Sequence, residues 1–169
     1  PDGIIAGGAG TWNATATNWT DTAGTSADPW NGKYAAFSGA AGTVTIDGTQ
    51  NVTGLQFLTD GYTLEPGAAG AIAIAQAQTP VRVESGATAT ISAPITGAGG
   101  IEKLNGGTLV LDGINTYTGN TAIRSGVLQV SADNQLGNGG AVSIDGGTLR
   151  IADAAFDTTA RNVSLDGAG

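Results

Sequence analysis

The sequence predicts an all-β protein, and within that class a parallel β-helix, a solenoid built from coils of about 20 residues. Three observations predict this fold: short strands of alternating polarity, glycine-rich turns between them, and strand motifs that recur at a near-constant spacing. Helical stripes are almost missing, because many of the 29 glycines and the β-branched residues interrupt them, with a weak exception at 153–161.

Runs in which apolar and polar residues alternate predict strands of about three to five residues. They lie at 44–46, 55–57, 72–74, 81–83, 109–111, 127–130, 142–144, 149–151 and 163–165. Asp-Gly and Gly-Gly pairs separate many of these runs, and such pairs favour tight turns. Turns that come this often exclude long sheets with long strands.

The spacing of the strands predicts how they stack. Leu109, Leu128 and Leu149 recur about every 20 residues, and Ile123, Val142 and Val163 form a second series with the same period. The segment Gly-Gly-Thr-Leu at 106–109 returns at 146–149, after two such periods. A parallel β-helix needs this repeat, because each coil returns to the same angular position one strand spacing further along. Roughly seven coils at about 4.8 Å each give a rod on the order of 35 Å long.

Composition limits the chemistry that the chain can perform. The sequence has no His and no Cys, which removes zinc sites, nucleophile triads and disulfides. Six Lys and Arg against fourteen Asp and Glu give a net charge of −8, which opposes binding to nucleic acid. We therefore expect no catalytic residue, no metal, no cofactor and no nucleic-acid partner.

Catalysis is the least favoured of the possible functions. Glycoside cleavage needs two carboxylates, which in this fold would lie on neighbouring coils, and Asp145 with Asp166 is the pair at coil spacing. Both residues fall in predicted turns. The five Asp-Gly pairs lack the clustered carboxylates of a calcium loop, and turn formation explains them better. Thr-x-Thr occurs at irregular spacings and predicts no ordered threonine array.

Residues 1–42 differ from the rest, and residues 43–169 carry the regular coils. Five of the nine aromatic residues lie in this first part: Trp12, Trp19, Trp30, Tyr34 and Phe37. One interpretation is an N-terminal coil or cap of the same solenoid, whose rings shield the apolar interior. The other is a ligand platform, in which Trp12, Trp19, Trp30 and Tyr34 contact a partner. The exposure of the three indoles distinguishes the two interpretations.

Two stretches resemble a known family. Residues 99–130, GGIEKLNGGTLVLDGINTYTGNTAIRSGVLQV, resemble the passenger-associated transport repeat of bacterial type V autotransporters, and LGNGGAVSIDGGTLRI at 136–151 resembles its continuation. The opening is similar to a recurring unit of large monomeric autotransporter adhesins, with GTWNATATNWTD, WNGKYAAFSG, GTVTIDG and NVTGLQFLTDGYTL in that order.

This resemblance implies a right-handed parallel β-helix passenger of a Gram-negative bacterium. Such a passenger is secreted across the outer membrane and displayed on the cell surface or released, and an outer-membrane β-barrel outside these residues anchors the parent. The resemblance also implies adhesion, through non-covalent contacts with a host cell-surface or matrix protein or glycan. The alternative is a structural stalk, or a self-association module, that presents an adhesive region elsewhere in the parent.

Overall fold

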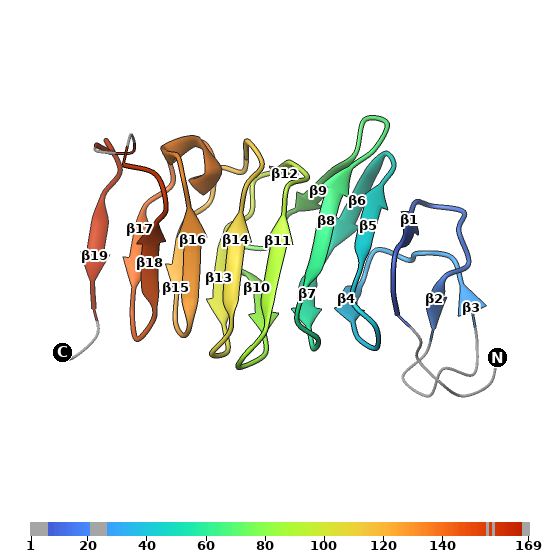
Figure 1. The fold of residues 1–169 in the computed structure, drawn as a ribbon. Coiled ribbons are helices and arrows are strands. Elements are labelled where there is room, and N and C mark those ends of the chain that lie inside the picture. The colour runs from blue at the N-terminus through green and yellow to red at the C-terminus, as the bar shows by residue number, and fades with distance from the viewer. Residues whose placement is uncertain (1–6, 21–26, 155, 157, 167–169) are drawn as a thin grey trace.

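The computed structural model describes residues 7–20, 27–154, 156 and 158–166. The chain winds as a parallel β-solenoid, so the elements follow one another along a rod with β1 near one end and β19 at the other (Figure 1). The predicted all-β solenoid is therefore confirmed.

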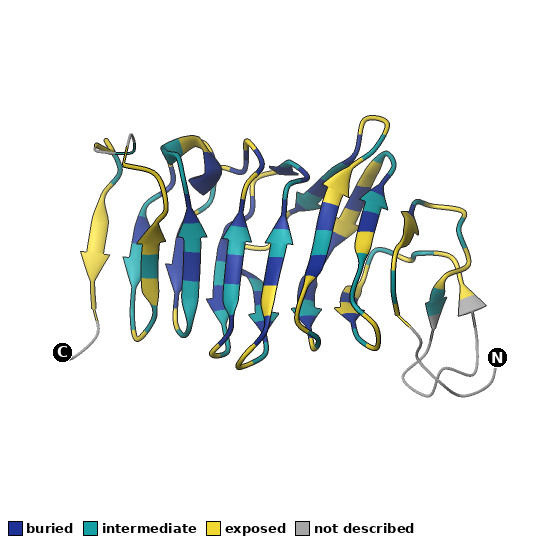
Figure 2. Ribbon diagram, viewed as in Figure 1, coloured by how far each residue is buried: buried dark blue, intermediate teal, exposed yellow. Residues whose placement is uncertain are grey.

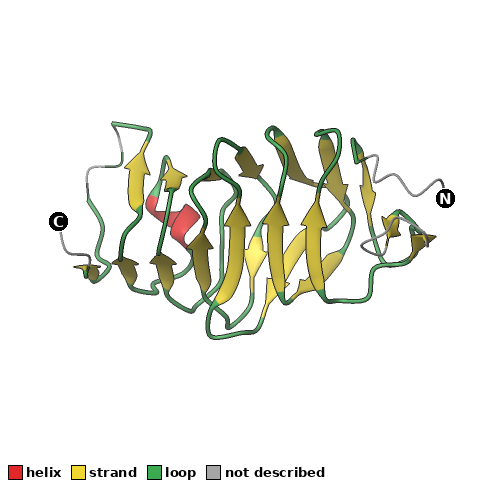
Figure 3. Cartoon of the chain, turned by 90° about the horizontal axis from the view of Figure 1, so that it is seen from below, coloured by secondary structure: helices red, strands yellow, loops and turns green. Residues whose placement is uncertain are grey.

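Short strands make up nearly all of the regular structure. The strands are β1 (Gly10–Trp12), β2 (Trp19–Thr20), β3 (Ala27–Asp28), β4 (Tyr34–Phe37), β5 (Thr43–Ile46), β6 (Thr49–Val52), β7 (Gly54–Phe57), β8 (Tyr62–Pro66), β9 (Ala71–Ile74), β10 (Thr79–Val83), β11 (Thr88–Ile91), β12 (Ile95–Thr96), β13 (Ile101–Leu104), β14 (Thr108–Leu111), β15 (Thr121–Ile123), β16 (Val127–Val130), β17 (Val142–Ile144), β18 (Thr148–Ile151) and β19 (Val163–Leu165). A 3₁₀-helix, η1 (Asp133–Leu136), lies toward the C-terminal end (Figure 3).

The sequence has a weak helical signal at 153–161. The residues of that stretch that the structure describes form no helix. Within the described residues, no helix has the length and apolar character needed to cross a bilayer.

The coils place their strands in three parallel sheets. Sheet 1 has the order β1-β5-β8-β11-β14-β16-β18, sheet 2 the order β19-β17-β15-β13-β10-β7-β4, and sheet 3 the order β12-β9-β6. Along the chain the strands visit sheets 2, 1 and 3 in turn, as β4, β5 and β6 do. Residues far apart in sequence therefore lie side by side on one face.

The register gives the length of each coil. Thr43 pairs with Thr63 and Ala89 with Leu109, so these coils take about 20 residues, as the solenoid repeat requires. The coil around β9 is longer, since Tyr62 of β8 pairs with Ala89 of β11. The predicted period is thus a property of most coils, with one long exception.

One predicted stack is correct and one is wrong by two positions. Leu109 pairs with Leu128 and Leu128 with Leu149, as predicted. Val142 does pair with Val163, but Ile123 pairs with Ile144 and not with Val142. The coil that contains η1 is longer than the coil from β14 to β16, so one spacing does not hold for both.

Inward-facing side chains form columns along the rod, and these columns are the core. In sheet 1 Leu109 and Leu128 are fully buried, and Leu149 packs against them at the edge of the cluster. Buried and less buried positions alternate along the central strands, whereas β19 is exposed throughout (Figure 2). A thin line of Ala, Val, Ile and Leu is enough to fill such an interior.

The described part of the N-terminal region takes part in the same sheets. β1 pairs in parallel with β5, and β4 pairs in parallel with β7. Between them, β2 and β3 form a short antiparallel pair. The boundary at residue 42 stays a prediction, and residues 1–6 and 21–26 of this region lie outside the described residues.

Candidate binding surface

The structure brings three of the four predicted contact residues together. The ring centroid of Trp12 lies 4.9 Å from that of Trp19 and 4.9 Å from that of Trp30, and the last two centroids are 4.6 Å apart. Trp12 is fully buried, while Trp19 and Trp30 are half-buried and pack against the core. Phe37 extends the cluster, with its ring centroid 5.8 Å from that of Trp12.

The indole N–H groups differ in their surroundings. Trp30 Nε1 donates to the carbonyl of Asn51 at 3.0 Å, whereas the buried Nε1 atoms of Trp12 and Trp19 have no hydrogen-bond partner among the described residues. This geometry favours a cap that shields the solenoid interior. A role of the three indoles in binding a partner stays a prediction.

Tyr34 lies apart from the indoles, on the outer face of sheet 2. Its ring lies against the backbone of Gly54, where an added Cβ would collide with a ring carbon. The hydroxyl donates to the carbonyl of Leu55 at 3.3 Å and accepts from Arg82 Nη1 at 2.8 Å. Tyr34 is 37% exposed, which makes it the most accessible of the four predicted residues.

Polar side chains from three successive coils lie on the same outer face, and Arg82 links them to the ring. Arg82 lies on β10, next to Gln56 in the strand register. Glu84 Oε1 accepts from Gln56 Nε2 at 3.0 Å and from Asn105 Nδ2 at 2.8 Å. Sequence reasoning missed Gln56, Arg82, Glu84 and Asn105, because only the register of β7, β10 and β13 brings them onto one face.

A chain of ion pairs continues along the same face. Arg124 Nε lies 3.1 Å from Glu102 Oε1, and Arg124 Nη1 lies 2.6 Å from Asp145 Oδ2. The hydrogen bonds that Arg124 donates to Asp145 and Glu102 raise its pKa. These three charges thus satisfy one another on an exposed surface, where such pairs add little stability.

The two carboxylates considered for catalysis have other partners. Asp145 pairs with Arg124, and Asp166 accepts a hydrogen bond from Ser164 Oγ at 3.0 Å. Among the described residues, no group of three or more His, Cys, Asp or Glu side chains is placed to hold a metal ion.

Lys103 is a charged residue inside the solenoid. It lies between Val81 and Ile123 in an inward column of sheet 2 and is fully buried. Its Nζ donates to the carbonyls of Leu104, Asn105 and Ser125 at 2.9, 2.8 and 3.2 Å. Burial lowers its pKa to about 8. With all three protons bonded inside, Lys103 is a structural residue.

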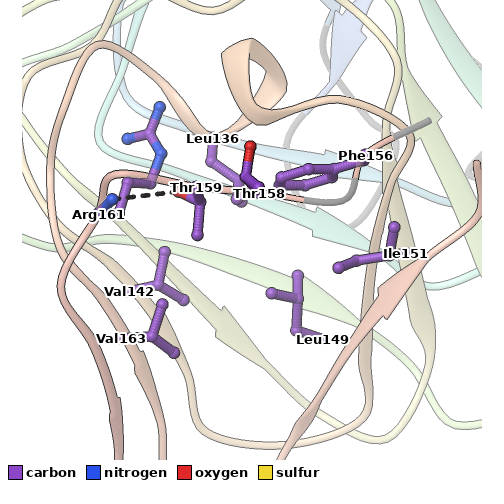
Figure 4. A pocket seen from close by; sticks show the side chains of 9 residues that line it. All are labelled: Leu136, Val142, Leu149, Ile151, Phe156, Thr158, Thr159, Arg161 and Val163. Atoms are coloured by element: carbon purple, nitrogen blue, oxygen red, sulfur yellow. Dashed lines mark hydrogen bonds between the residues drawn. The ribbon is translucent and has the colours of Figure 1, made fainter. Parts of the chain in front are cut away.

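A cavity of about 230 Å³ lies between the last coils, near the C-terminal end (Figure 4). Aliphatic and aromatic side chains dominate its wall, and Arg161 closes one side. The lining residues are Leu136, Val142, Leu149, Ile151, Phe156, Thr158, Thr159, Arg161 and Val163. None of the residues predicted from the sequence to contact a partner lies in this lining.

Comparison with known proteins gives two matches. Residues 101–130 match the passenger-associated-transport-repeat family. Over 99% of its length, the chain is 41% identical to a protein of Brucella suis biovar 1 (strain 1330) named Adhesin BmaC autotransporter. The chain spans 5% of that relative's length. No solved structure matches the chain significantly.

The stacked coils define a parallel β-solenoid repeat protein, a class that uses extended outer faces for binding. Within that class, the chain belongs to the passengers of bacterial autotransporters, as its sequence motifs predicted. Membership of this family implies a protein that is displayed at the cell surface or secreted.

Proposed function

We propose that this chain acts in adhesion as part of an autotransporter passenger, through non-covalent contacts with host cell-surface or matrix molecules. The observation that carries the proposal is its 41% identity, over nearly all of its length, to a protein named as an autotransporter adhesin. The proposed role is binding without catalysis.

The fold supports this role physically. Parallel coils produce continuous outer faces, and each face repeats along the rod at the strand spacing of about 4.8 Å. A partner can therefore contact several coils at once. Tyr34 is the candidate with the best access, and Trp19 and Trp30 are half-buried at the same end of the rod. Trp12 is fully buried and would act by holding the other two rings.

A structural stalk is the second candidate, because the chain spans only 5% of its adhesin relative. The outer face of sheet 1 fits such a role. Thr43, Thr63, Thr90, Val110 and Gln129 form one uncharged column across successive coils, which continues to Arg150 on β18. Such a column could also pack against the same column of a second rod, which would make the stalk a self-association module.

Binding of the isolated chain separates these roles. We expect it to bind cultured host cells or immobilised matrix proteins and glycans more strongly than an unrelated β-protein of similar size and net charge. If the chain binds no more strongly than that control, the structural stalk is the role that remains. Sedimentation over a range of concentrations tests self-association. A chain that stays monomeric at the highest concentration would exclude the self-association module.

A further inference from the structure

We propose that the outer face of sheet 2 around Tyr34 is a binding site for a saccharide that carries a carboxylate, of the uronic or sialic acid class. This inference rests on the proposed adhesive function and deepens it, since it names the ligand class and the residues. The Tyr34 surface, as we call it, consists of Tyr34, Gln56, Arg82, Glu84 and Asn105.

The tyrosine ring supplies a platform for a sugar. Gly54 leaves room beneath it, since a Cβ there would collide with the ring, so the ring lies directly on the strand backbone. Tyr34 is 37% exposed, and the guanidinium carbon of Arg82 lies over part of the ring, 5.8 Å from its centroid, so a sugar would pack on the ring surface that Arg82 leaves accessible. The C–H groups of a pyranose pack well on the electron-rich face of an aromatic ring. The bond from Arg82 to the hydroxyl holds the ring in place.

The charges around the ring favour an anionic ligand. The chain has six cationic side chains against fourteen acidic ones. Arg124 and Arg161 are ion-paired, and Lys103 is inside the solenoid. Among the described residues, Arg82 forms no ion pair with a carboxylate. Its bond to Tyr34 uses one N–H group, which leaves other donors of the guanidinium for a ligand carboxylate.

A second cation lies beside the ring in sequence. Lys33 immediately precedes Tyr34, is exposed, and forms no ion pair among the described residues. Among the acidic groups on this face, Glu102 is ion-paired with Arg124, whereas Glu84 is held by two neutral amides and keeps its negative charge. Two cations without an ion-pair partner among the described residues thus belong to this region: Arg82 contacts the ring, and Lys33 is its neighbour in sequence.

The remaining residues suit the hydroxyl groups of a sugar. Gln56 and Asn105 each use one amide N–H to hold Glu84, so each amide retains a donor and a carbonyl oxygen. A saccharide fits this set better than an acidic protein segment, because specific protein interfaces have an apolar centre. Here one aromatic ring lies among amides and charges.

The test is a titration of the full 169-residue chain with short saccharides, followed by calorimetry or NMR. We use 3′-sialyllactose for the sialic acid class, a hyaluronan tetrasaccharide for the uronic acid class, and lactose as the neutral control. We expect binding of at least one acidic probe, weaker binding as salt increases, and no binding of lactose at the same concentrations. Absence of binding by both acidic probes would overturn the proposal.

Variants locate the site. Arg82→Gln and Tyr34→Ala should each weaken binding about tenfold or more, the loss expected when a charge-assisted hydrogen bond or a stacking ring is removed. Arg150→Gln is the matched control, because Arg150 is an exposed arginine on sheet 1 that bonds only to Gln129 among the described residues. Circular dichroism and thermal unfolding check that each variant is folded. Full affinity in Arg82→Gln would contradict the proposed site.

Two further measurements separate this site from its rivals. A glutamate-rich peptide that competes as well as the acidic saccharides would assign the surface to an acidic protein segment and overturn the proposal. Adhesion of the chain to host cells is measured in parallel. Adhesion that is unchanged in Arg82→Gln, without saccharide binding, would reject the site while keeping the adhesive function. Saccharide binding by a chain that does not adhere to host cells would keep the site and reject the adhesive function.

Discussion

At the scale of single residues, Lys103 shows how a charge is accommodated inside the solenoid. Its three ammonium protons are directed at three carbonyl oxygens from two neighbouring coils. The ammonium thus donates to turn carbonyls that would otherwise be buried without a donor. A buried polar group left without a partner costs about 1–3 kcal/mol. Burial nevertheless lowers its pKa to about 8, because the interior disfavours the charge.

This lowered pKa predicts how stability depends on pH. Between pH 8 and 10.5 the unfolded chain binds more protons at this lysine than the folded chain, so the free energy of unfolding rises with pH. The rise should reach about 1–2 kcal/mol by pH 10. Above pH 10 the trend should reverse, because burial raises the pKa of Tyr117 from 10.0 to about 12.

Urea unfolding at several pH values, with Lys103→Met as the comparison, measures this dependence. The variant should lose the rise between pH 8 and 10 but keep the fall above pH 10. The same rise in the variant would show that Lys103 is not its origin.

Asn115 predicts a second residue-scale effect. Its buried side chain joins three coils: Oδ1 accepts from the backbone N–H of Ile95 at 2.7 Å, and Nδ2 donates to the carbonyl of Gln135 at 2.6 Å. Asn115→Ala leaves both backbone groups buried without this partner and should cost about 2–4 kcal/mol in denaturant unfolding. Asn138→Ala, at an exposed position, is the control. Equal stability of the two variants would contradict the bridging role.

At the scale of elements, the indole cluster should stabilise the N-terminal end. Trp12→Ala removes the ring that contacts Trp19, Trp30 and Phe37 and should lower the free energy of unfolding by about 3–5 kcal/mol. Urea unfolding followed by circular dichroism measures the loss. Leu165→Ala, at a position that is 77% exposed, should change it by less than about 0.5 kcal/mol. A loss that small in Trp12→Ala would reject the cap.

The last coil depends on another cluster. Arg161 Nε lies 2.9 Å from Asp133 Oδ1, and its guanidinium also donates to the carbonyls of Gly137 and Gly140. Arg161→Ala should therefore abolish hydrogen-exchange protection of the amides of β19, with little change at β11. Retained protection of β19 would show that strand pairing alone holds the last coil.

The same ion pair gives an acid dependence. Hydrogen bonds from Arg161 lower the pKa of Asp133, so its contribution to stability is present above the ordinary carboxyl pKa and lost as pH falls through the lowered value.

About half of the strands could be predicted from sequence. All nine predicted strands are present, but ten further described strands were not predicted, β8 and β11 among them although their burial alternates. β13 and β15 were missed, because Ile-Glu-Lys-Leu places a lysine at an inward position and Thr-Ala-Ile is buried along its whole length. η1 was missed because a 3₁₀ turn this short has no periodic signal.

At the scale of the whole molecule, the coil period could be predicted and the lateral register only in part. Glycine turns and repeated leucines are local signals, so they predict the stacking of Leu109, Leu128 and Leu149. The long coil around β9 and the partner of Ile123 depend on loop lengths that periodicity does not specify. The Tyr34 surface follows from register alone, and therefore only Tyr34 was among the predicted contacts.

The central claim is that successive coils stack in parallel, since this stacking creates every face described above. The chain has no cysteine, so spin labels can be placed at will. Thr43, Val110 and Arg150 lie in one outward column, with Val110 three strand spacings and Arg150 five spacings from Thr43. Double electron–electron resonance measures the distance between spin labels on two introduced cysteines. It should give about 14 Å between positions 43 and 110 and about 24 Å between positions 43 and 150. Separations that do not grow with the number of coils would contradict the solenoid.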